Sequence, residues 1–250
     1  MLYIFLHSFK SHINMKYIFV NIICLGMLTS SLSSFAQGIR VVYSMQMNTP
    51  AHAELNDPAI RAVVEAQLRS LNRNFVLLHH NGESLYFPDG ASQSNSQQMG
   101  ANTVIYKNQK NRQMVSQDNI VDRQFLITEP LNQIQWKLTS EEKKIGNLIG
   151  KKAICENSGL TAWFTPEIPI SDGPGRNWGL PGLILELQNA AQTIIVQEIN
   201  MNYDTSGKIA APTSGRSVSR QEFNEIRDQR LKEMGVEGGV EHGGVRVIRM

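Results

Sequence analysis

The chain has 250 residues, of which 41% are hydrophobic and 18% charged, and this is enough for one domain of ordinary size with a buried core. The composition excludes a disordered chain and a membrane protein with many spans. The net charge is +2, and residues 1–36 hold two basic side chains and no acidic one, which leaves 22 of each sign in the remainder. A neutral domain lacks the basic surface that nucleic acid requires, so we expect no nucleic-acid partner.

Residues 1–36 have the pattern of a secretory signal peptide. Lys16 precedes an apolar run of about a dozen residues, and the segment ends in Ser34-Phe35-Ala36, which favours cleavage after Ala36. Residues 1–14 then read as an over-extended start before Met15. The run is shorter than the ~20 residues of a membrane span, so we expect no span after cleavage. The predicted location is the periplasm or the periplasmic face of the outer membrane.

Cys155 is the only cysteine of the predicted mature chain. A lone thiol has no partner for an intrachain disulfide, so it is either a buried small hydrophobic side chain or a reactive thiol.

The first half of the mature chain predicts one helix among strands. A β-branched segment at 38–47 opens it, and Asp57-Pro58 then provides the N-cap and first residue of a helix over 58–71. The apolar stripe of this helix consists of Ile60, Val63, Val64, Leu68 and Leu71. Asn81-Gly82 favours a two-residue hairpin turn between strands at 75–80 and 83–87.

A series of short strands separated by polar turns follows. We expect a polar loop at 91–100 and strands at 103–107, 113–116, 124–128, 133–138, 151–156, 161–165, 183–187 and 193–201. In the segment 133–138, the alternation predicts that Ile134, Trp136 and Leu138 face inward. Glu141 to Lys144 is interpreted as a solvated turn.

The predicted fold is mainly β, with a curved antiparallel meander or incomplete β-barrel over 37–202. One or two helices are expected to cover the sheet, and the helix over 58–71 is expected to cover one opening. Residues 203–250 are predicted to form a linker, a short charged helix and a flexible tail. Ser219 and Glu222 form a capping box at the start of that helix, and Gly235 is its stop signal. Val245 to Met250 would suit an added edge strand.

A motif in the centre of the chain resembles a known family. The segment from Trp163 to Pro174 is followed by Gly179-Leu180-Pro181-Gly182-Leu183-Ile184, and this hexapeptide is the signature of the GLPGLI family of exported Gram-negative proteins. The block from Trp136 to Ala153 is also similar, although Gly150 stands where many relatives have a cysteine. The resemblance implies an uncharacterised envelope protein, often associated with outer-membrane receptor systems, and implies no established activity.

The hexapeptide has two physical interpretations. The two glycines can adopt φ values that other residues rarely adopt, and Pro181 fixes its own φ, so the motif is rigid. It is either a structural corner that leads into a buried strand or a rigid apolar rim. In the second interpretation Trp163, Trp178 and Leu180 contact a ligand or partner. We expect Gly182, which precedes the buried strand, to need a positive φ.

Other candidate sites have weaker patterns. His79, His80 and Glu83 contain metal-binding residue types, but adjacent strand residues point to opposite faces, so we expect no metal site there and no cofactor. Neither a Gly-x-Ser-x-Gly nor a phosphate-binding motif is present in the sequence. The first function hypothesis is therefore a non-catalytic envelope binding or accessory protein for an outer-membrane transporter, a receptor or an apolar ligand. The alternative is a periplasmic hydrolase that uses Glu167 or Asp172.

Overall fold

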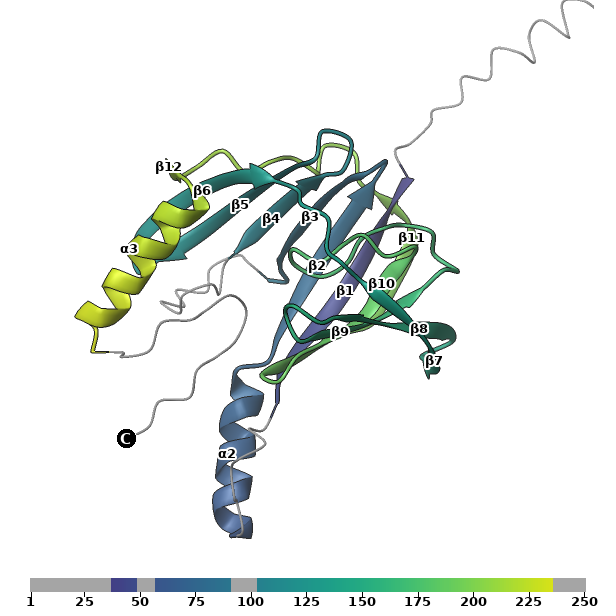
Figure 1. Ribbon diagram of the computed structural model, residues 1–250, viewed down its shortest axis with the longest axis horizontal. Helices are drawn as coiled ribbons and strands as arrows, with labels where there is room; N and C mark the ends of the chain where they lie inside the picture. The colour runs from purple at the N-terminus through teal and green to yellow at the C-terminus, as the bar shows by residue number, and fades with distance from the viewer. Residues whose placement is uncertain (1–36, 49–56, 91–102, 236–250) are drawn as a thin grey trace, which may run out of the picture. The chain divides into compact units, whose positions relative to one another are not determined.

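The computed structural model describes residues 37–48, 57–90 and 103–235, which form one large β-sheet and two helices (Figure 1). The predicted signal peptide, the loop at 91–100 and the tail from 236 lie outside the described residues. The strands are β1 Gln37–Met47, β2 Arg73–His80, β3 Glu83–Pro88, β4 Val104–Asn108, β5 Gln113–Ile120, β6 Arg123–Pro130, β7 Lys137–Ile145, β8 Leu148–Cys155, β9 Leu160–Thr165, β10 Leu183–Gln188, β11 Gln192–Asp204 and β12 Arg216–Val218. The helices are α2 Pro58–Ser70 and α3 Arg220–Glu233.

The twelve strands form one sheet in the order β12-β6-β5-β4-β3-β2-β1-β11-β10-β9-β8-β7. All pairs are antiparallel except β12 with β6, and β12 and β7 are the two edges, so the sheet does not close into a barrel. The mainly antiparallel β fold is therefore confirmed. The long β11 pairs with β1 near the middle of the sheet, which joins the two meanders that the chain forms on either side.

The hairpin at Asn81-Gly82 is confirmed. Both residues have positive φ, at 51° and 79°, and the turn joins β2 to β3 in the expected register.

The prediction for the segment 133–138 is wrong. Residues 131–136 form no strand, and Leu138 lies in β7 with 56% of its surface exposed. Trp136 instead packs against the core from an irregular segment, where its indole Nε1 donates to the carbonyl of Trp178 at 2.8 Å. Glu141 to Lys144 form part of β7 rather than a turn, and the chain reverses at Gly146, whose φ is +60°.

The covering role predicted for the first helix is also wrong. α2 begins at Pro58 with Asp57 as its N-cap, as expected, but none of its residues is buried, and Val63 is 67% exposed. The apolar stripe of the helix does not by itself identify the surface against which the helix packs. α3 does contact the sheet, because Phe223 is buried and packs edge-on against Phe125 of β6 with ring centroids 5.6 Å apart. Neither helix is long and apolar enough to cross a membrane in the described part of the chain.

Gly182 lies where two backbone segments nearly touch. Its φ is +155°, and a Cβ built on it would lie 2.1 Å from the carbonyl oxygen of Thr165. The following strand, β10, holds Leu183, Ile184 and Leu185 fully buried, so this close approach directs three large side chains into the core.

We predict that Gly182→Ala lowers the free energy of unfolding by more than about 2 kcal/mol, because the backbone strain is added to a clash with a carbonyl that cannot rotate away. The matched control is Gly207→Ala, which also has a positive φ, +68°, but open space around the new Cβ. That variant should lose only about 1 kcal/mol. Thermal denaturation followed by circular dichroism measures both, and equal losses would contradict the structural role of the motif.

Candidate functional site

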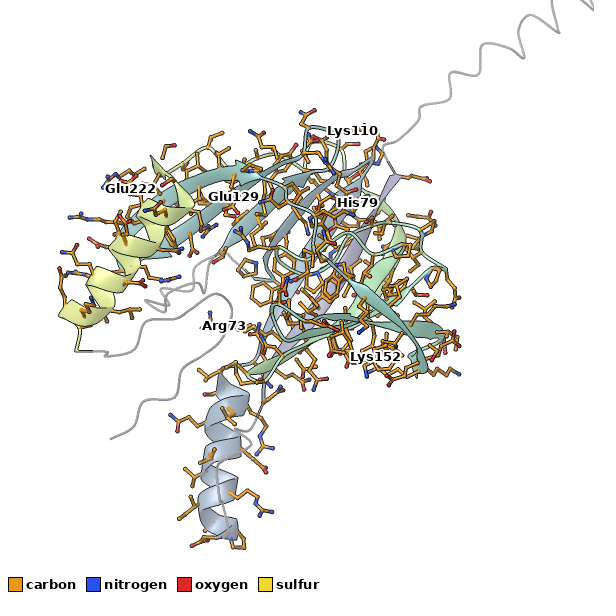
Figure 2. All side chains as sticks on the ribbon, viewed as in Figure 1. Arg73, His79, Lys110, Glu129, Lys152 and Glu222 are labelled. Carbon is orange, nitrogen blue, oxygen red and sulfur yellow. The ribbon has the colours of Figure 1, made fainter. Side chains whose placement is uncertain are left out.

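Polar side chains form a row across the buried face of five neighbouring strands. His79 pairs with Ser84, Ser84 with Lys107, Lys107 with Met114 and Met114 with Glu129, so β2, β3, β4 and β6 each contribute one polar residue and β5 contributes the apolar Met114. Directly opposed residues of an antiparallel sheet point to the same face. The segment 166–182 between β9 and β10, which contains most of the hexapeptide, contacts this row along its length (Figure 2, where His79 and Glu129 are labelled).

Lys107 is a lysine with no exposed surface. Its ammonium lies 2.5 Å from Oδ1 of Asp172 and donates to the carbonyls of Gly173 and Gly175, each at 2.9 Å. All three N–H bonds therefore have acceptors, which is the condition under which a buried ammonium is tolerated. All three acceptors belong to the segment 166–182.

Asp172 is the centre of the cluster. Oδ1 accepts from the backbone N–H of Gly173 at 2.8 Å as well as from Lys107, and Oδ2 lies 3.0 Å from Nδ1 of His79. Burial alone would raise the pKa of this carboxyl, but the charge of Lys107 and the hydrogen bond with His79 outweigh it and hold the pKa well below the ordinary value of 3.8. Asp172 is therefore ionised in this arrangement.

Tyr43 of β1 is linked to Asp172 through the backbone of Ile184. Its hydroxyl donates to the carbonyl of Ile184 at 2.7 Å, and the N–H of Ile184 donates to the carbonyl of Asp172 at 3.0 Å. Burial, followed by the negative charge of Asp172, raises the pKa of Tyr43 well above its ordinary value, so the hydroxyl keeps its proton.

The end of the segment near α3 is held by a second set of charges. Glu129 forms ion pairs with Arg176 of the segment and, at 2.8 Å, with Arg220 at the start of α3. Burial acts to raise the pKa of Glu129, but the two guanidinium groups lower it overall. The segment 166–182 is thus held by the contact with His79 at one end of the row and by the ion pairs of Glu129 at the other.

The residues of the predicted apolar rim are not brought together. Leu180 is 1% exposed and belongs to the core, so it offers no surface to a partner. Trp163 neighbours the core residue Phe164 along β9 and therefore points to the opposite face of the sheet, where Lys143 lies 4.4 Å from its ring centroid. Trp178 is half-buried, and its indole donates to the carbonyl of Asn132 at 3.0 Å. Ligand binding by Trp163 and Trp178 stays a prediction.

The two acids of the alternative hydrolase hypothesis are also apart. Glu167 is exposed and accepts from the backbone N–H of Ile149 at 3.1 Å, whereas Asp172 has no exposed surface. Hydrolysis by a pair of carboxylates needs two acids that lie close together where a substrate can reach them. Glu167 and Asp172 do not form such a pair. The hydrolase stays a prediction that these contacts do not favour.

His79, His80 and Glu83 make three separate sets of contacts. His79 contacts Asp172, Nδ1 of His80 faces the carbonyl of Gln37, and Glu83 accepts hydrogen bonds from Tyr106 and Asn108. No group of three possible metal ligands occurs within the described ranges.

A groove lies beside α3. Its volume is about 460 Å³, and its walls come from the end of β5, the start of β6, β12 and the second half of α3. It is lined by Ile120, Asp122, Arg123, Phe125, Arg216, Ile226, Gln229, Arg230 and Glu233.

Sequence reasoning missed Lys107 and assigned His79 only a weak metal hypothesis. One signal for Lys107 was present, because strand alternation places it on the same face as the core residue Ile105. An inward lysine needs a buried partner, but nothing in the local sequence identifies Asp172 as that partner.

We predict that Lys107→Met lowers the free energy of unfolding by about 3–5 kcal/mol, because it leaves the carboxylate of Asp172 buried without its cation. The matched control is Lys137→Met, which removes a comparable 2.8 Å contact with Glu156 from an exposed site and should leave the free energy of unfolding nearly unchanged. Urea denaturation measures both. Similar losses for the two variants would show that the buried contact has no special structural weight.

Comparison with protein families gives one match, to a family described as a protein of unknown function (Porph_ging), over residues 154–186. This region contains the hexapeptide and Asp172. A comparison with curated proteins finds no match.

Two solved structures of PNGF-II, in the P21 and C2 space groups, are similar to this chain with TM-scores of 0.54 and 0.52 at 14% and 15% sequence identity. The matches cover 78% of this chain, but this chain spans only about a third of the length of those proteins, 34% and 33%. At this identity the likeness concerns the fold alone.

Proposed function

We propose that this protein is an exported, non-catalytic binding protein of the cell envelope, related to the GLPGLI family, and that its ligand occupies the groove beside α3. The family proposal is supported by the intact hexapeptide at 179–184, which lies inside the region matched by a family of unknown function. Export is supported by the signal-peptide pattern before Gln37.

The groove carries the binding proposal. Its volume of about 460 Å³ lies within the range of sites for small organic ligands, roughly 300–1,000 Å³. Its lining includes the half-buried Ile226 and the edges of the buried Ile120 and Phe125, so a small apolar floor lies among charged side chains.

Arginines surround this apolar floor. Arg216 pairs with Glu222 at 2.6 Å and Arg230 with Glu233 at 2.7 Å, whereas Arg123 is exposed and forms no ion pair with any described residue. A free guanidinium beside an apolar surface suits a ligand with an apolar chain and one carboxylate, because arginine binds carboxylates through two parallel hydrogen bonds. The ligand class we propose is therefore an amphipathic acid of the fatty-acid type.

Dodecanoate is a suitable probe, with dodecanol as the neutral comparison, and isothermal titration calorimetry measures both. We expect wild type to bind dodecanoate more tightly than dodecanol and Arg123→Gln to weaken dodecanoate binding about tenfold, which corresponds to about 1.4 kcal/mol. The same variant should leave dodecanol binding unchanged, because only the acid group contacts the guanidinium.

Lys110→Gln is the matched control, since it removes one exposed positive charge in the turn at the other end of β5 (Figure 2). It should bind dodecanoate as wild type does. Absence of dodecanoate binding by wild type, or equal weakening by the two variants, would contradict the proposed site.

A further inference from the structure

The buried contact between Lys107 and Asp172 has the geometry of a reactant pair as well as that of an ion pair. We propose that Nζ of Lys107 and Cγ of Asp172 condense to an amide, which would join β4 covalently to the segment 166–182. The inference is independent of the groove and of any ligand.

The distance and the burial favour this reaction. Nζ lies 2.5 Å from Oδ1, so it is also in contact with Cγ, to which Oδ1 is bonded, and neither side chain has exposed surface. Two groups held in contact react with effective concentrations on the order of 10⁵–10⁸ M. Exclusion of bulk water from the pair also opposes hydrolysis of the amide once it has formed.

The hydrogen bonds of Lys107 orient its nitrogen. The carbonyls of Gly173 and Gly175 hold two of the three N–H bonds, and the third points at Asp172. When the third proton passes to Oδ1, the nitrogen is a neutral amine whose lone pair faces the carboxyl group. The ion pair is the resting form, and this proton transfer within it produces the neutral amine and acid that react.

The carboxyl group is held by donors on both oxygens. Gly173 N–H donates to Oδ1, and His79 in its Nδ1–H form donates to Oδ2. Donors aimed at both oxygens stabilise the negative charge that develops when the amine attacks Cγ.

The step balances without a further reactant. The ammonium begins with three protons, of which one stays on the amide nitrogen and two leave with Oδ1 as water. The C–N bond forms and the C–Oδ1 bond breaks, while Oδ2 becomes the amide oxygen. Ser84 is paired in register with both His79 and Lys107, and its buried hydroxyl has no hydrogen-bond partner among the described residues, so it is placed to relay a proton or to hold the released water.

Trypsin digestion of the unfolded chain followed by mass spectrometry tests the proposal directly. Trypsin does not cleave after an acylated lysine, so we expect residues 74–110 to remain joined to residues 153–176, with a mass below the sum of the two peptides by one water. Recovery of 74–107 and 153–176 only as separate, unmodified peptides would overturn the proposal.

Two variants separate the covalent bond from the ion pair. Lys107→Arg keeps the positive charge, but its guanidinium is not nucleophilic, so the joined peptide should be absent. His79→Gln should reduce the joined fraction, because it removes the imidazole that faces Oδ2. If either variant fails to fold, the peptide masses of the wild-type chain still decide the question.

Discussion

The segment between β9 and β10 depends on one buried contact, that between Lys107 and Asp172. The segment runs for 17 residues from 166 to 182 along the inner face of the sheet, and its part from Asp172 to Pro174 is buried. Long irregular segments are rarely buried because their N–H and C=O groups need partners. Lys107 provides such partners to two carbonyls and a carboxylate at once, so a single side chain of β4 fixes the middle of the segment.

This contact places the rest of the hexapeptide region. With Asp172 fixed, its backbone pairs with Ile184, and the hydroxyl of Tyr43 binds the other polar group of that residue. Gly182 then allows the chain to pass the carbonyl of Thr165 before β10 begins. The motif and the ionic cluster are therefore parts of one structural unit, in which the glycine permits the path and the charges hold it.

The elements were largely predictable from the sequence because their signals are local. The turn at Asn81-Gly82, the N-cap Asp57 and the N-cap Ser219 each depend on residues within a few positions, and the structure contains all three, although the carboxylate of Glu222 pairs with Arg216. The candidate site was not predictable because its contacts are distant in the chain; His79 and Asp172 are 93 residues apart. The strand predicted at 133–138 failed for the same reason, since the indole of Trp136 is held by Trp178, a partner that local alternation does not reveal.

The cluster also explains why a lysine stands where strand alternation would favour an apolar residue. A buried ion pair by itself stabilises a fold little, and an apolar pair of similar volume often serves as well. An apolar pair would not serve as well here. A methionine or leucine at 107 would remove the positive charge and would also leave the carbonyls of Gly173 and Gly175 without the donors that Lys107 provides. Replacing Lys107 and Asp172 together by apolar residues would remove the charge problem but not the two orphaned carbonyls. Lys107 therefore serves the backbone of the segment that covers it as well as the carboxylate of Asp172, and an apolar replacement would have to compensate for both.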